Sequence, residues 1–156
     1  QPQAQVLGVA RPELLDPMAG ALQQLGLERA VVVHGAGGLD EASLAGVNDL
    51  RLIEAGQVTA RQLSPEDVGL VAAPLDALRG GDLATNQDIL RNVLQGRGSE
   101  AQANVVAFNT ALVLWAAGVE TDLNRAAAQA LAALREGKAW ERLEALRVEL
   151  DRGNGQ

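Results

Sequence analysis

One continuous apolar segment that runs into a glycine-rich, acidic loop constrains the fold of this chain more than any other feature. Residues 30–33 are all apolar, as in a strand that is covered on both faces of a sheet. The loop that follows has three glycines between Gly35 and Gly38, so it can turn sharply and approach a ligand closely. Asp40 and Glu41 end the loop, and their oxygen ligands suit a hard cation such as Mg²⁺. The segment therefore predicts a sheet strand with a candidate metal site beyond its end.

A helix flanked by two strands is expected in the first third of the chain. Residues 5–9 have the pattern of a short strand, and residues 29–33 have that of a second. Between them, Pro12 suits the first turn of a helix with apolar residues at helical spacing, and Gly26 ends it. A strand, a helix and a second strand in this order predict a parallel pair.

The residues after the acidic loop predict a hairpin and then only helices. A short helical turn is expected over residues 41–44, followed by strands at 48–53 and 58–63. Helical patterns begin with Ser64 as a cap and end near residue 150. Within them, Ser99 and Gln102 predict a capping box at the start of the most apolar helix. We therefore expect an α/β fold: a mostly parallel sheet of at least four strands, flanking helices and a helical C-terminal layer. The strand-rich part is residues 1–63, the helical part 64–150, and the tail 151–156 is expected to fray.

Composition excludes several classes of function. The 156 residues include 47% apolar residues, enough for a real core. A net charge of −7 argues against binding to nucleic acid, which requires clustered cations. The absence of cysteine excludes disulfides, a thiolate nucleophile and a cysteine zinc site.

Location and completeness can also be read from the pattern. The longest apolar run, residues 105–119, is interrupted by Asn109 and is shorter than the ~20 residues that a bilayer requires, so it predicts a buried helix and no membrane partner. No signal sequence opens the chain, which favours a cytoplasmic location. The chain begins at Gln1 without an initiator Met, and this suggests a piece of a longer protein.

The acidic loop has alternative interpretations. Asp40 stands where a dinucleotide fingerprint requires its last glycine, and no Gly-Lys-Ser/Thr follows, so neither common nucleotide motif fits. In the structural alternative, Asp40 caps a short helix and Glu41 favours its positive end. In the functional alternative, the pair lies where α/β sheets place ligands.

Other polar residues also have two interpretations. His34, the only histidine, could act as a general acid or base or contact a phosphate, but a strand-end histidine more often binds a backbone carbonyl. No nucleophile elbow is present, and we assign no catalytic residue. Asp82 with Asn86 could form part of a polar site, but helix capping is the favoured interpretation. Asn109 is expected to be a buried, hydrogen-bonded core residue that joins elements. Arg91 and Arg97 could contact a phosphate, but a solvated face is favoured for them.

Four segments taken together resemble anthranilate phosphoribosyltransferase, specifically its second half. They are residues 34–41, 65–70, 80–86 and 109–111, and their order and spacing are more specific than any one motif. The resemblance covers essentially the whole chain. It implies transfer of the phosphoribosyl group from phosphoribosyl pyrophosphate to anthranilate, with release of pyrophosphate, in tryptophan biosynthesis. It also implies a Mg²⁺ cofactor and a homodimer when the protein is full length.

The resemblance assigns the metal to Asp40 and Glu41, which match the carboxylates that bind magnesium on the pyrophosphate in that family. The family's Gly-Thr-Gly-Gly-Asp phosphate loop and its anthranilate-binding arginine are expected upstream of Gln1. The chain would then hold about half an active site and be inactive alone. Two alternatives remain: a nucleoside phosphorylase of the same fold, and a non-catalytic assembly or regulatory module.

Overall fold

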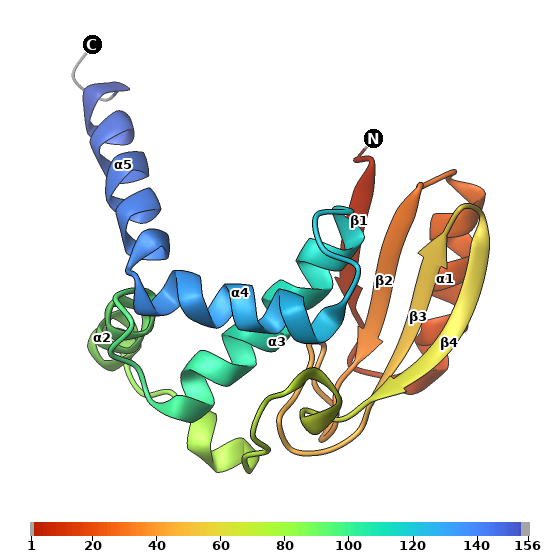
Figure 1. Cartoon of the computed structure of the whole chain (residues 1–156), viewed down its shortest axis with the longest axis horizontal. Helices are drawn as coiled ribbons and strands as arrows, with labels where there is room; N and C mark the ends of the chain where they lie inside the picture. Colours follow the sequence, from red (N-terminus) through yellow and green to blue (C-terminus); the bar gives the residue numbers. More distant parts are fainter. Residues whose placement is uncertain (1, 154–156) are drawn as a thin grey trace.

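The computed structural model describes residues 2–153 and shows a four-stranded sheet joined to a helical region (Figure 1). The strands are β1 (Ala4–Gly8), β2 (Arg29–His34), β3 (Asn48–Glu54) and β4 (Gln57–Leu63). They follow one another across the sheet in chain order. All four strands lie within two residues of the boundaries expected from the sequence, and the α/β class is confirmed.

The expectation of a mostly parallel sheet is wrong for the described residues. The strands β1 and β2 are parallel, as the connecting helix predicts, with Val6 opposite Val31. The other two pairings, β2 with β3 and β3 with β4, are antiparallel. The reason is that only one connection contains a helix, which a parallel crossover needs, whereas the acidic loop and a tight turn join the others.

The alternating side chains of β2 contribute to two separate cores. Val31 and Val33 pack on one face with Phe108 and other residues of the C-terminal helices. Ala30 and Val32 pack on the opposite face against the first helix. These four strand residues are at most 1% exposed, which confirms that the apolar segment is covered on both faces.

Five α-helices within residues 2–153 pack on this sheet or extend beyond it. They are α1 (Leu15–Gln24), α2 (Leu83–Leu94), α3 (Glu100–Ala116), α4 (Leu123–Arg135) and α5 (Lys138–Gly153). A 3₁₀ turn, η1 (Pro12–Leu14), leads into α1. In Figure 1, α1 lies on one side of the sheet, while α3 and α4 lie on the other and carry α2 and α5 beyond it. Among residues 2–153, no helix has the length and apolar character needed to cross a membrane.

Capping residues explain where several helices begin. The carboxylate of Asp82 accepts a hydrogen bond from the Thr85 amide at the start of α2, as expected. The expected capping box of Ser99 and Gln102 opens α3. Asp122 caps α4 by accepting from the Arg125 amide.

Two expectations about the helical part are corrected. The segment after Ser64 forms only a 3₁₀ turn, η2 (Glu66–Val68), and the Ser64 hydroxyl donates to Asp67 at 2.9 Å instead of acting as the cap. A second 3₁₀ turn, η3 (Leu75–Leu78), precedes Gly80. At the other end, α5 continues to Gly153, so residues 151–153 are helical, and the expected fraying of residues 154–156 falls outside the described residues.

Candidate functional site

The glycine-rich loop closes on itself directly after β2. The Gly35 amide donates to the Leu39 carbonyl at 2.8 Å, and the Leu39 amide donates back to the Gly35 carbonyl at 3.3 Å. Between them, Gly37 and Gly38 have φ values of +84° and +83°, which side-chain-bearing residues rarely adopt. The three glycines therefore serve a compact turn that delivers Asp40 and Glu41 beside the end of the strand.

Two further contacts seat the backbone of the acidic pair on glycines. A Cβ placed on Gly8, the last residue of β1, would lie 1.5 Å from the Asp40 carbonyl oxygen. A Cβ placed on Gly35 would lie 2.0 Å from the Glu41 carbonyl oxygen. Because backbone atoms occupy the space that a side chain would need, both positions require glycine. The loop is thus packed against the ends of β1 and β2 by close backbone contacts.

The buried side chain of Asn48 organises the rest of the loop. Its amide oxygen accepts from the Ser43 amide at 2.7 Å and from the Ala36 amide at 3.3 Å. Its amide nitrogen donates to the carbonyls of Ser43, Gly46 and Leu63 at 3.0–3.1 Å. The residue is 0% exposed, so these bonds satisfy an amide that water does not reach.

Asn109 of α3 holds the residue that follows the acidic pair. Its amide oxygen accepts from the Ala42 amide and its amide nitrogen donates to the Ala42 carbonyl, both at 2.9 Å. A further bond to the Val105 carbonyl at 3.0 Å fixes the amide on its own helix. The expectation that Asn109 joins elements through hydrogen bonds is therefore confirmed, but the residue is half-buried and not fully buried as expected.

The short helix expected over residues 41–44 does not form. These residues are not helical, because the side chains of Asn109 and Asn48 form hydrogen bonds with the backbone groups of Ala42 and Ser43. Asp40 therefore has no helix to cap at Glu41. The structural alternative for the acidic pair loses its basis.

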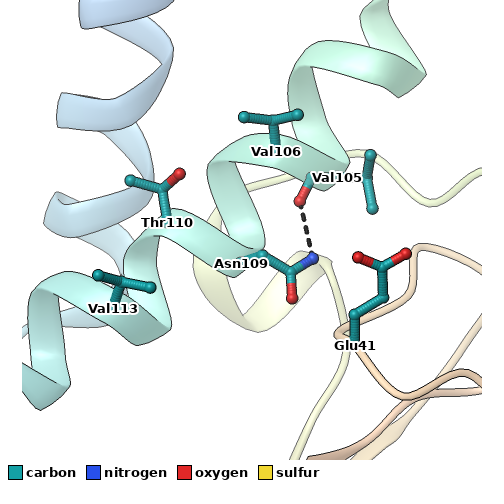
Figure 2. A pocket seen from close by; sticks show the side chains of 6 residues that line it. All are labelled: Glu41, Val105, Val106, Asn109, Thr110 and Val113. Carbon is teal, nitrogen blue, oxygen red and sulfur yellow. Dashed lines mark hydrogen bonds between the residues drawn. The ribbon is translucent and has the colours of Figure 1, made fainter. Parts of the chain in front are cut away.

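Both carboxylate residues of the pair are exposed, and Glu41 borders two hollows on α3. The first hollow has a volume of about 310 Å³ and is lined mainly by α3 residues, including Val105, Asn109 and Val113. Figure 2 shows the Glu41 side chain beside this helix, with its carboxylate extending toward Val105. The second hollow, about 340 Å³, lies between Glu41 and α2. Glu41 thus places a charge at the border of a largely apolar surface.

The acidic pair fits Mg²⁺ better than a metal that needs a closed protein cage. Within residues 2–153, no group of three or more His, Cys, Asp or Glu side chains is placed to hold a metal. Magnesium keeps several waters and commonly takes one or two carboxylates together with substrate phosphates. Two exposed carboxylates on a fixed backbone match that donor set. Zinc, which binds nitrogen and sulfur ligands in structural sites, does not match it.

The remaining candidates have structural partners. His34 Nδ1 lies 2.8 Å from the Val9 carbonyl oxygen, so the histidine ties the ends of β1 and β2, as its structural alternative predicts. Asn86 Oδ1 accepts from the Gly81 amide at 2.9 Å, and its amide nitrogen donates to the Gly81 carbonyl at 3.0 Å. Arg91 pairs with Asp88 at 2.8 Å, and Arg97 donates to Gln95. None of these contacts involves Asp40 or Glu41.

Sequence reasoning missed Gly8 and Asn48. Gly8 ends a short strand, and only its contact with Asp40, far along the chain, shows why the residue must lack a side chain. Asn48 looked like the first residue of a strand. A polar amide directly before the apolar alternation of β3 was the available signal.

Comparisons with known proteins show which family this chain belongs to. Residues 1–140 match the family model described as "Glycosyl transferase family, a/b domain". Anthranilate phosphoribosyltransferase from Synechococcus sp. (strain CC9902) is 68% identical over all of this chain and 45% of the relative. The enzyme of the same name from Parasynechococcus marenigrum (strain WH8102) is 69% identical over 96% of this chain and 43% of the relative. The chain thus spans somewhat less than half the length of these curated relatives.

Solved structures show the same fold. The anthranilate phosphoribosyltransferase of Thermus thermophilus aligns with a TM-score of 0.81 and 42% identity, over 91% of this chain and 41% of that one. The Saccharomyces cerevisiae enzyme, solved in complex with PRPP and Mg, aligns with a TM-score of 0.79 and 25% identity, over 90% of this chain and 41% of that one. The resemblance expected from the four segments is confirmed, and the chain belongs to the glycosyl transferase family, a/b domain.

Proposed function

We propose that the protein containing this chain transfers the phosphoribosyl group of phosphoribosyl pyrophosphate to anthranilate, with release of pyrophosphate, in tryptophan biosynthesis. The relatives with 68% and 69% identity carry the name of this activity. The observation that carries the proposal is the fixed loop at the end of β2, which presents Asp40 and Glu41 as two exposed carboxylates. The yeast relative solved with PRPP and Mg supports the same substrate and metal.

In this proposal, Asp40 and Glu41 hold Mg²⁺ against the pyrophosphate of the donor. The metal would stabilise negative charge that accumulates on pyrophosphate as its bond to the ribose carbon breaks. The chain's own contribution is positional: Gly8 and Gly35 seat the loop backbone, and Asn48 and Asn109 hold the residues that follow the acidic pair. Because the reaction joins the amine directly to the ribose carbon, no covalent nucleophile is needed from this chain.

The test uses the full-length gene product and follows anthranilate consumption as Mg²⁺ is varied. The double variant Asp40→Asn, Glu41→Gln should raise the Mg²⁺ concentration for half-maximal rate at least tenfold, or abolish turnover. The matched control, Glu66→Gln with Glu141→Gln, removes two exposed charges elsewhere and should behave as wild type. Unchanged Mg²⁺ dependence in the acidic-pair variant would refute the metal role. Cleavage of nucleosides with phosphate, without use of phosphoribosyl pyrophosphate, would refute the reaction. The homodimer and the cytoplasmic location expected from the sequence stay predictions.

A further inference from the structure

The amide of Asn109 pairs with the backbone of Ala42 in the way that one strand pairs with another. Ala42 donates its N–H to Asn109 Oδ1 and accepts at its carbonyl from Asn109 Nδ2, both at 2.9 Å (Figure 2 shows Asn109 and Glu41). The remaining amide proton goes to the Val105 carbonyl at 3.0 Å. Rotating the amide by 180° would put donor against donor and acceptor against acceptor. The hydrogen bonds therefore allow one orientation of this side chain.

Ala42 connects α3 to the acidic pair, because it follows Glu41 and is hydrogen-bonded to Asn109. It is 0% exposed, so its backbone groups have no water to replace Asn109. The peptide bond between Glu41 and Ala42 lies close to Gly35. A Cβ on Gly35 would be 2.0 Å from the carbonyl oxygen of this peptide. This peptide is held by Gly35 on one side and by Asn109 on the other, so two separate segments of the chain fix the backbone from which the Glu41 side chain extends.

We propose that Asn109 is a positioning residue for Glu41: it does not contact the metal, but it fixes the direction in which Glu41 presents its carboxylate. This inference rests on the proposed function, because it assigns Glu41 to the magnesium on the phosphoribosyl donor. Groups that orient a metal ligand typically change metal affinity roughly 10- to 100-fold when they are removed. Asn109 acts through the backbone of the next residue, so we expect an effect at the lower end, about tenfold.

The experiment measures binding, not turnover, in the full-length gene product. Phosphoribosyl pyrophosphate is titrated calorimetrically at a series of Mg²⁺ concentrations, which gives the Mg²⁺ concentration for half-maximal binding. Asn109→Leu keeps the branched shape of the side chain and removes all three hydrogen bonds, whereas Asn109→Ala removes the branched group as well. Both variants should raise the half-maximal Mg²⁺ concentration about tenfold and leave donor affinity at saturating Mg²⁺ close to wild type. Hydrogen exchange at the Ala42 amide should become faster in both.

Asn104→Ala is the matched control. Asn104 is a buried asparagine on the same helix, 6% exposed, and within residues 2–153 its side chain makes no hydrogen bond to the acidic loop. Its substitution can destabilise α3 but should leave the Mg²⁺ dependence unchanged.

The outcomes separate the two proposals. If the variant Asp40→Asn, Glu41→Gln binds as wild type, the metal assignment fails, and the positioning role fails with it. If that variant loses Mg²⁺-dependent binding while Asn109→Leu keeps wild-type dependence, the positioning role alone is overturned. The positioning role is also overturned if both Asn109 variants fail to fold, because Asn109 is then a folding residue, or if Asn104→Ala shifts the dependence equally.

Discussion

Replacing Gly8 with alanine tests whether the acidic loop requires a residue without a side chain at the end of β1. The added Cβ would lie 1.5 Å from the Asp40 carbonyl oxygen and 2.5 Å from the Asp40 carbonyl carbon. These are backbone atoms, so no side-chain rotation can relieve the overlap. Ordinary contact begins near 3.4 Å, and the strand end and the loop must therefore separate by about 2 Å.

The size of the effect follows from what that separation disturbs. Gly8 pairs with Val33 in the parallel ladder, and the next amide, Val9 N, donates to the Val33 carbonyl at 2.9 Å. Overpacking at a well-packed position costs typically about 1–3 kcal/mol. A Gly→Ala change also recovers about 0.4–1 kcal/mol where the native backbone suits alanine, by restricting the unfolded chain. We expect a net loss of about 1–2 kcal/mol in the free energy of unfolding.

The assay is chemical denaturation of the full-length gene product, together with the Mg²⁺ dependence of its activity. Gly20→Ala in α1 is the control, because a Cβ there has nothing within 4 Å and alanine is favoured in a helix by roughly 0.5–1 kcal/mol. The same substitution should therefore stabilise at Gly20 and destabilise at Gly8. The Gly8 variant should also require more Mg²⁺, since the loop that carries Asp40 is displaced. Equal or greater stability of Gly8→Ala, with unchanged Mg²⁺ dependence, would refute the reasoning.

Two further predictions concern the loop and a separate ion pair. Asn48→Ala should lower the free energy of unfolding by at least about 3 kcal/mol in a denaturant titration, because five hydrogen bonds of a fully buried amide are lost; a loss below about 1 kcal/mol would show that water replaces the amide. The Arg125 guanidinium, helped by the Asp122 amide, lowers the pKa of Glu120 from 4.5 to about 2. Since the folded pKa is depressed, this carboxylate stabilises the fold above pH 4.5, and the contribution is lost as the pH falls from there through about 2. Carboxyl NMR titration should show the pKa of Glu120 rising toward 4.5 in Arg125→Gln, and an unchanged pKa would exclude Arg125 as its cause.

Features that depend on neighbouring residues could be predicted from the sequence. The helix between β1 and β2 predicted their parallel pairing, and the hairpin of β3 and β4 followed from two alternating segments around a short turn. Asp82 and Ser99 were identified as caps because a cap and its partner lie three residues apart. In each case, the pattern that predicted the structure lies in one continuous segment of the chain.

Features that depend on distant partners were missed. The helical pattern at residues 41–44 was overridden because Asn109, 67 residues away from Ala42, takes the backbone groups of that residue. Ser64 does not act as a cap, because its hydroxyl and its amide both donate hydrogen bonds to the Asp67 carboxylate. Nothing near Gly8 indicates that the Asp40 carbonyl will occupy its side-chain position. The metal assignment to Asp40 and Glu41 came from local chemistry and family resemblance, and it stays a prediction.

The shape of the acidic loop does not depend on its two charged side chains. The loop is positioned by carbonyls against glycines and by amides of Asn48 and Asn109, and none of those contacts uses a carboxylate of Asp40 or Glu41. The two acidic side chains can therefore be exchanged without changing the backbone that carries them. Evolution or design can replace them with amides, longer acids or cations on the same loop. Substitutions at Gly8 or Gly35, by contrast, alter the loop backbone and leave the charges intact.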